Sequence, residues 1–187
     1  EIFASCTYGP RVYGYLGDRA NINLLLVLQT HRPKIRHFAK KFNDVEVSIL
    51  AMTLEAFESD VELGQFGEIV AEIIALPYHP LVNADYLEEM EVKIKRRFVL
   101  ELLRNIIWQY PDLSTELLIE PEYFMYEGFR RRVRLLPALA HGFAEVFQKN
   151  VRKQNINSIM HGYLEALKIL ETENIVRSFV FKHIFEG

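Results

Sequence analysis

The sequence lacks several features that would mark particular classes of protein. It holds one cysteine, Cys6, in 187 residues, which excludes an internal disulfide framework and any zinc site built from several cysteines. Its longest apolar run, residues 22–28, is interrupted by Asn23 and is far too short to span a bilayer. No internal repeat or low-complexity linker is visible. The composition, 50% hydrophobic and 25% charged, is that of a globular chain rather than a disordered one.

Positive charge is missing from one long stretch. Residues 42–92 hold twelve acids and no Lys or Arg, whereas residues 1–41 hold seven Lys or Arg against two acids. Residues 93–153 hold twelve Lys or Arg against seven acids, so the formal net charge of −3 hides an acidic segment between two basic ones. Such segregation indicates either a basic face for polyanions or pairing between acidic and basic parts of the fold.

No secretory leader is visible, so a cytoplasmic location is expected. The absence of a membrane-length apolar run also predicts no membrane partner. The chain begins at Glu1 without a methionine and enters an apolar segment at once. We therefore expect that residues upstream of this start are missing.

The first 83 residues predict a mixture of strands and short helices. Three segments have the apolar or alternating pattern of strands: 2–6, 22–28 and 45–50. Residues 32–41 are predicted as a short basic amphipathic helix, and Thr53 as the N-cap of another helix. A further helix is predicted over 67–76, followed by an exposed turn at 78–80.

From residue 84 onward the pattern becomes helical. Apolar residues recur at a spacing of about 3.6 over 84–110, and Pro121 is well placed to begin the next helix. Two further helices are predicted over 138–152 and 156–170. Residues 175–185 are apolar, aromatic and β-branched, and are predicted to be extended.

These segments predict an α+β fold with two parts. The first is a domain with a small mixed sheet at 1–83, and the second is a mainly helical domain at 84–187. The helix and extended ribbon at the end of the chain are compatible with a partial winged-helix element, which would suit contact with nucleic acid or protein. A plain packing or dimerisation element is the alternative.

The stretch that joins the first two predicted strands carries the most informative pattern. The first strand contains Ser5, a loop with Gly9 and Gly14 follows, and the next strand begins with Asn21 and Asn23. Residues two apart on a strand point to the same face. The two asparagine side chains are therefore expected to lie side by side at one end of the sheet.

This pattern resembles the core of the nucleotidyltransferase superfamily, which includes DNA polymerase β, poly(A) polymerases, CCA-adding enzymes and minimal archaeal nucleotidyltransferases. The family pattern is an apolar residue, Gly-Ser, a Gly-containing loop, and Asp-hydrophobic-Asp on the next strand. Here Ser5 stands at the Ser position, Ala4 replaces the Gly, and both Asp positions hold asparagine. Glu46, in Val-Glu-Val, matches the third carboxylate of the family. The resemblance covers residues 1–80 and implies a nucleotidyltransferase-like fold.

The departure from the family pattern changes the expected chemistry. Paired carboxylates hold divalent metal ions that clamp the attacking and leaving oxygens of phosphoryl transfer, and magnesium prefers charged oxygen ligands. Asn21 and Asn23 offer only neutral amide oxygens, and Glu46 alone does not restore a two-metal site. We therefore expect metal-dependent transfer to be lost or very weak. No cofactor is expected. Mg²⁺ is expected only if the altered site can still bind it.

A phosphate would still find binding groups without a metal. Backbone N–H groups at a glycine turn, together with a serine hydroxyl, form an anion nest. The residues predicted to bind nucleotide in this way are Ser5, Cys6, Gly9, Arg11 and Gly14. Cys6 is equally explained as a small buried residue, and Arg11 as an ordinary loop arginine. No metal-ligand pairing is found among the six histidines.

A dense basic run lies in the helical half. It predicts a surface for nucleic acid formed by Arg130, Arg131, Arg132 and Arg134. Neighbouring aromatic residues could stack on bases. The alternative is that the aromatics are core residues and the arginines pair with the acids of residues 42–92.

Three functions remain open from the sequence. The first is a catalytically impaired nucleotidyltransferase-fold protein that binds nucleotide, RNA or a protein partner. The second is an active metal-dependent enzyme that uses Glu46 with Asp18 or Asp44. The third is an antitoxin-like or structural interaction protein, which would act through a protein partner or as a homo-oligomer.

Overall fold

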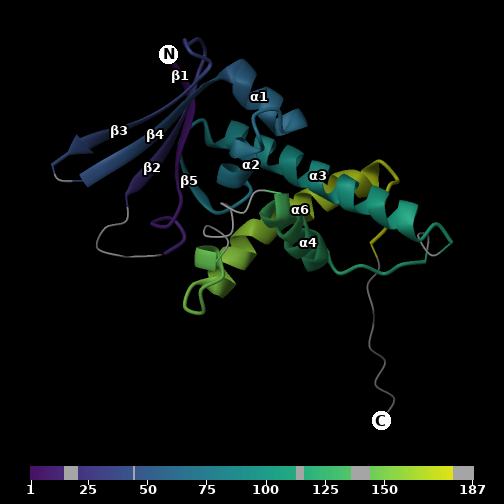
Figure 1. The fold of residues 1–187 in the computed structure, drawn as a ribbon. Helices are drawn as coiled ribbons and strands as arrows, with labels where there is room; N and C mark the ends of the chain where they lie inside the picture. Colours follow the sequence, from purple (N-terminus) through teal and green to yellow (C-terminus); the bar gives the residue numbers. More distant parts are fainter. Residues whose placement is uncertain (15–20, 44, 113–115, 136–143, 179–187) are drawn as a thin grey trace.

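The computed structural model describes residues 1–14, 21–43, 45–112, 116–135 and 144–178. Five strands form one sheet (Figure 1): β1 (Ile2–Tyr8), β2 (Ile22–Leu28), β3 (Ile35–Phe42), β4 (Val45–Thr53) and β5 (Tyr78–Val82). Helices follow or cover it: α1 (Leu54–Leu63), α2 (Ile69–Ile74), α3 (Ala84–Gln109), α4 (Pro121–Leu135) and α6 (Arg152–Thr172). A mixed sheet followed by long helices confirms the predicted α+β class.

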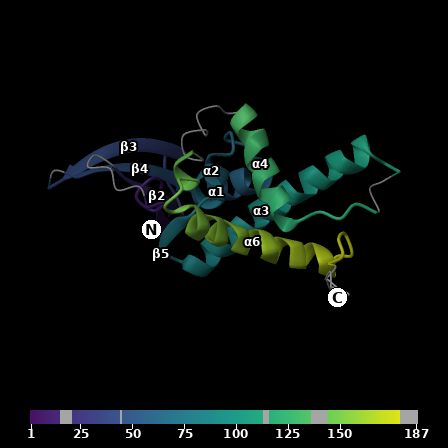
Figure 2. The same ribbon diagram turned by 90° about the horizontal axis from the view of Figure 1, so that it is seen from below.

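The sheet has the strand order β3-β4-β2-β1-β5. β2 and β4 are parallel, and the other neighbours are antiparallel. Cys6, Leu25 and Leu50 are aligned across the three central strands and are at most 7% exposed. The helices lie to one side of the sheet in both views (Figures 1 and 2). The apolar pattern of β2 thus places a row of buried side chains at the centre of the fold.

The hydrophobic core continues from the sheet into the helices. One cluster of buried residues contains Leu25 of β2, Phe57 of α1, Phe98 of α3 and Tyr163 of α6. The change from sheet to long helices falls where it was predicted, since β5 ends at Val82 and α3 begins two residues later. The division into two domains at that point stays a prediction.

Several elements have the bounds that the sequence pattern predicts. β2 spans the predicted residues, and α3 ends one residue before the predicted end. The Thr53 hydroxyl accepts a hydrogen bond from the Ala56 N–H at 3.2 Å, which confirms Thr53 as the N-cap of α1. α4 begins at Pro121, as its fixed φ angle and missing N–H favour.

Two elements differ from the prediction. Residues 32–41 were expected to be helical, but Ile35–Phe42 forms β3 and pairs antiparallel with β4. The local charge pattern fits a helix, and pairing with the neighbouring strand outweighs it. The expected turn at 78–80 is part of β5, which pairs with β1 at one edge of the sheet. Proline is tolerated there because an edge strand has N–H positions that need no partner.

The end of the chain is described only in part. Residues 144–146 are helical and residues 147–151 form turns, so the single helix predicted to run to Arg152 is wrong at its end, and 138–143 lie outside the described residues. α6 is longer than the predicted helix over 156–170. The predicted ribbon, and with it the winged-helix element, falls mostly outside the described part of the chain. None of the described helices is both long and apolar enough to cross a membrane.

Candidate functional site

The two motif asparagines lie at one end of the central strands. Asn21 directly precedes β2, and Asn23 is aligned with Ser48 of β4. Because Ile22 is aligned with Val47, strand alternation puts Glu46 on the same face and at the same end as both asparagines. Asn21 and Glu46 are exposed, and Asn23 is half-buried. The structure therefore brings these three residues together.

The glycine turn lies against Asn23. The Gly9 carbonyl accepts hydrogen bonds from the N–H groups of Val12 and Tyr13, at 2.9 and 3.2 Å. Gly9 has φ +86°, and a Cβ there would be 2.5 Å from Asn23 Nδ2. Both the backbone conformation and the contact require glycine. The expected juxtaposition of a glycine turn and the start of β2 is thus present.

Ser5 does not join this group. It is aligned with Leu26, whereas Cys6 is aligned with Leu25, so the two side chains point to opposite faces of the sheet. The Ser5 hydroxyl, in a residue that is 3% exposed, faces away from the side that carries Asn23. Cys6 is on that side but is fully buried, and burial raises the pKa of its thiol to about 12. The predicted contact of either residue with a nucleotide stays a prediction.

The rest of the loop is anchored on the helical half. A Cβ at Gly14, which has φ +87°, would be 2.7 Å from Val151 Cγ1. The buried Asn155 side chain donates to the carbonyls of Tyr13 and Val146, at 3.1 and 3.0 Å. Arg11 is exposed on the same turn. Asp18 and Asp44, the alternative carboxylates, lie outside the described residues, so they remain predictions.

Sequence reasoning missed three titratable residues near this turn. Tyr8 is aligned with Asn23, and burial, followed by the nearby Glu72 carboxylate, raises its pKa to about 12. Burial and then Glu72 also raise the pKa of Tyr13. The Glu72 carboxylate is itself partly removed from water, which raises its pKa. Glu72 lies on α2, far along the chain from the motif, and no spacing pattern connects it to the glycine turn.

Asn21, Asn23 and Glu46 do not by themselves form the carboxylate set of a two-metal centre. In place of paired carboxylates, Asn21 and Asn23 present neutral amides beside one carboxylate, Glu46. Within the described parts of the chain, no group of three or more His, Cys, Asp or Glu residues is arranged to hold a metal ion.

The arginine run is divided between the surface and the interior. Arg130 makes two hydrogen bonds of 2.6 Å to the Glu127 carboxylate, and Arg131 lies 3.6 Å from it. Arg134 is exposed. Arg132 is only 6% exposed, so the structure does not place it on a surface open to nucleic acid. Nucleic-acid binding by the other three arginines stays a prediction.

Arg132 belongs to a charge network that joins three helices or their ends. Its guanidinium lies 2.6 Å from Glu68 and 3.2 Å from Glu101. Arg97 Nη1 lies 2.8 Å from the same Glu68 carboxylate. Pairing of the basic segment with acids of residues 42–92 is thus confirmed at Glu68. Phe124 and Phe129 are buried as core residues, whereas Tyr123 and Tyr126 are about 40% exposed.

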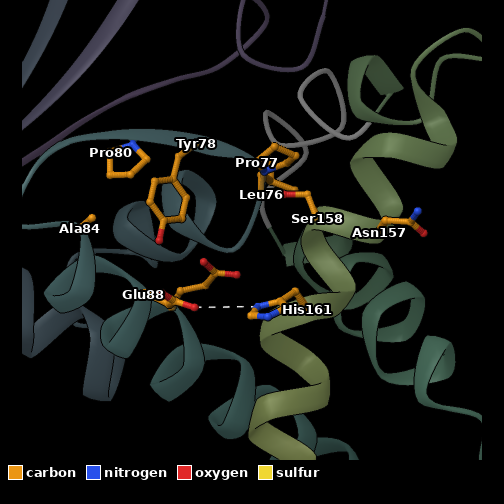
Figure 3. A pocket seen from close by; sticks show the side chains of 10 residues that line it. Leu76, Pro77, Tyr78, Pro80, Ala84, Glu88, Asn157, Ser158 and His161 are labelled. Atoms are coloured by element: carbon orange, nitrogen blue, oxygen red, sulfur yellow. Dashed lines mark ion pairs between the residues drawn. The ribbon is translucent and has the colours of Figure 1, made fainter.

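A cavity of about 440 Å³ lies between β5, the start of α3 and α6 (Figure 3). Its lining combines polar and apolar side chains: Leu76, Pro77, Tyr78, Pro80, Ala84, Glu88, Glu91, Asn157, Ser158 and His161. Figure 3 shows Tyr78 and Glu88 pointing toward its centre, with His161 on the opposite helix. His161 Nδ1 lies 3.9 Å from Glu88 Oε1. Burial, followed by the nearby Glu91 carboxylate, raises the pKa of Tyr78.

A fully buried lysine lies behind this cavity. Lys95 donates to the Glu91 carboxylate and to the Ile159 carbonyl, the latter at 2.7 Å. Burial lowers the pKa of Lys95, and Glu91 opposes that shift. A Cβ at Gly162 would be 2.6 Å from Glu91 Oε1 and 2.9 Å from Lys95 Cδ. The spacing of four residues predicts an ion pair between Glu91 and Lys95 on α3, but it does not predict that α6 buries this pair.

No family model and no curated protein matches this chain. Among solved structures, it is similar to a nucleotidyltransferase-like protein from Exiguobacterium sibiricum. The similarity covers 91% of this chain and 70% of the other, at 12% sequence identity and a TM-score of 0.39. At that level, similarity assigns neither a family nor a site.

Proposed function

We propose that the chain is a nucleotide-binding protein with a nucleotidyltransferase-like core, in which metal-dependent transfer is lost or very weak. One observation carries the proposal: the Gly9 turn lies against Asn23, at the end of the sheet that also bears Asn21 and Glu46. In the resembled family pattern, this arrangement of turn and strand carries the nucleotide phosphates. Here the same positions carry amides in place of carboxylates.

The amides favour a direct contact with phosphate. An aspartate can only accept hydrogen bonds and repels a phosphate unless a cation lies between them. An asparagine side chain has two N–H donors, and Asn21 is exposed at the end of β2. The Asn23 Nδ2 group, beside the Gly9 turn, adds a second donor. Binding would therefore depend on hydrogen bonds from the chain itself and not on a bridging metal.

Substitution of Gly9 tests whether this turn binds nucleotide. Gly9→Ala introduces a Cβ that displaces the Asn23 amide, and we expect it to weaken ATP binding by about tenfold, the loss of a hydrogen bond to a charged group. Gly67→Ala is the matched control, since Gly67 has φ +81° with open space around a Cβ. It carries a similar backbone strain without a clash.

The readout is the dissociation constant of ATP, measured by calorimetry in the presence of EDTA, with thermal unfolding of each variant as a check on folding. Equal affinities for the Gly9→Ala and Gly67→Ala proteins would contradict the assignment of the turn. If neither variant nor the parent protein binds ATP saturably, the proposal of nucleotide binding is contradicted altogether. Metal-dependent incorporation of labelled nucleotide by the parent protein would contradict the loss of transfer.

A further inference from the structure

We propose that the cavity between β5, α3 and α6 binds a small aliphatic cation with a primary ammonium group, of the size of a diamine or a short polyamine. The cavity volume of about 440 Å³ lies in the range of small-molecule sites, roughly 300–1,000 Å³. Its walls come from three elements that are far apart in the sequence. The proposal concerns a different place in the fold from the Gly9 turn and does not depend on nucleotide binding.

The charged groups that face the cavity leave one negative charge in excess when His161 is neutral. Glu91 is compensated by the buried Lys95. Within the described part of the chain, Glu88 has no such close cation: its ion pair is with His161 at 3.9 Å, beyond hydrogen-bond distance. A ligand ammonium could therefore approach Glu88 without displacing an existing strong ion pair.

The remaining lining suits a short methylene chain. Leu76, Pro77, Pro80 and Ala84 supply apolar wall, and the Tyr78 ring extends into the space between the helices (Figure 3). An aromatic face attracts a cation as well as alkyl groups. Ser158 on α6 offers an acceptor for a second amine. A phosphate or carboxylate ligand would instead meet the uncompensated Glu88 carboxylate, which disfavours anions here.

The buried ion pair fixes one wall of this cavity. Removing a lysine ammonium from water costs several kcal/mol, and apolar side chains of similar volume could fill the same space. The chain nevertheless holds Lys95 against Glu91, and a Cβ at Gly162 would force these two side chains to shift. Perturbed ionisable groups beside a cavity are characteristic of functional sites. Lys95 thereby holds the Glu91 carboxylate in place at the wall of the cavity.

Titration with putrescine and spermidine tests the proposal. We expect saturable binding by the parent protein and a loss of about tenfold or more in affinity for Glu88→Gln, because a charged hydrogen-bond partner is removed. Glu89→Gln is the matched control: Glu89 is the next residue on α3 and pairs with the exposed Lys93, outside the cavity lining. It should change the affinity less than twofold. 1,4-Butanediol, which has the same length as putrescine and no charge, should not bind.

Two further readouts locate the bound amine in this cavity. The chemical shifts of Tyr78, followed by NMR, should move on titration with putrescine and should move much less for Glu88→Gln at an amine concentration near the dissociation constant of the parent protein. ATP affinity should be equal in the parent and Glu88→Gln proteins. A failure of the amine-binding proposal can therefore be distinguished from a failure of nucleotide binding at the Gly9 turn. Absence of saturable amine binding, or an equal loss for Glu89→Gln and Glu88→Gln, would overturn the proposal.

Discussion

The end of the sheet and the cavity between the helices present opposite chemistry. At the sheet end, Asn21 and Asn23 offer neutral donors beside an exposed Glu46. At the cavity, Glu88 and Glu91 offer carboxylates, one of which is backed by a fully buried ammonium. We therefore propose an anionic ligand for the first region and a cationic ligand for the second. The second region also contains a deeply buried ion pair, so substitutions there should change the stability of the fold as well as ligand binding.

The buried ion pair should give the largest effect. Lys95→Met leaves Glu91 without its partner in a largely buried position, and we expect the free energy of unfolding to fall by about 3 kcal/mol. The exposed Lys93, four residues after its partner Glu89, is the control, and Lys93→Met should cost less than about 0.5 kcal/mol. Chemical denaturation measures both values.

The double variant Lys95→Met with Glu91→Met sharpens this prediction. Replacing both partners by apolar side chains removes the uncompensated charge, so most of the lost stability should return. If Lys95→Met costs no more than Lys93→Met, the buried pair does not differ energetically from a surface pair. The cavity region would then not depend on a buried ion pair for its stability.

Substitution of Arg132 and of Arg131 should show a smaller difference in stability of the same kind. Arg132→Met removes the guanidinium that joins Glu68 and Glu101, and we expect a loss of about 2 kcal/mol, since both acids are partly exposed. Arg131→Met should cost less than about 0.5 kcal/mol, because its partner Glu127 lies on the same helix at 3.6 Å. Equal losses in thermal or chemical denaturation would contradict the assignment of Arg132 to the interior.

A prediction on reactivity rather than stability concerns Cys6, on the buried face near Asn23. The thiolate is the reactive form, and burial raises the pKa of this thiol to about 12. We expect Ellman's reagent to react with the native protein at least about a hundredfold more slowly than with the unfolded protein at the same pH. If the thiol of the native protein reacts nearly as fast as that of the unfolded protein, the sheet opens readily around Cys6.

Local patterns in the sequence predicted several parts of the fold well. The apolar run of β2, the Thr53 cap and the spacing of Asn21 and Asn23 depend on neighbours along the chain, so their geometry follows from strand alternation and capping. The same local reasoning failed for β3, because the pairing of residues 35–42 with β4 is a contact between strands. Nor could it give the face of the sheet on which Ser5 lies, because that depends on the register between β1 and β2.

The cavity and the charge network could not be predicted in this way. Lys95 contacts the carbonyl of Ile159, and Arg132 contacts Glu68, each across a separation of 64 residues. The segregation of charge along the sequence indicated pairing of acidic and basic segments as one of two outcomes. Only the packing of α3 against α4 and α6 shows which arginines take part and which stay at the surface.

The magnesium dependence of ATP binding tests the central claim most directly. Calorimetry should be run on the parent protein and on the Asn21→Asp, Asn23→Asp double variant, each with EDTA and with Mg²⁺. We predict that the parent binds ATP at least as tightly in EDTA as in Mg²⁺. The double variant should bind at least about tenfold more weakly in EDTA, through charge repulsion, and should gain affinity when Mg²⁺ is added. The claim of metal-free nucleotide binding would be contradicted if the parent protein requires Mg²⁺ to bind ATP. It would also be contradicted if the double variant binds ATP in EDTA as tightly as the parent protein does.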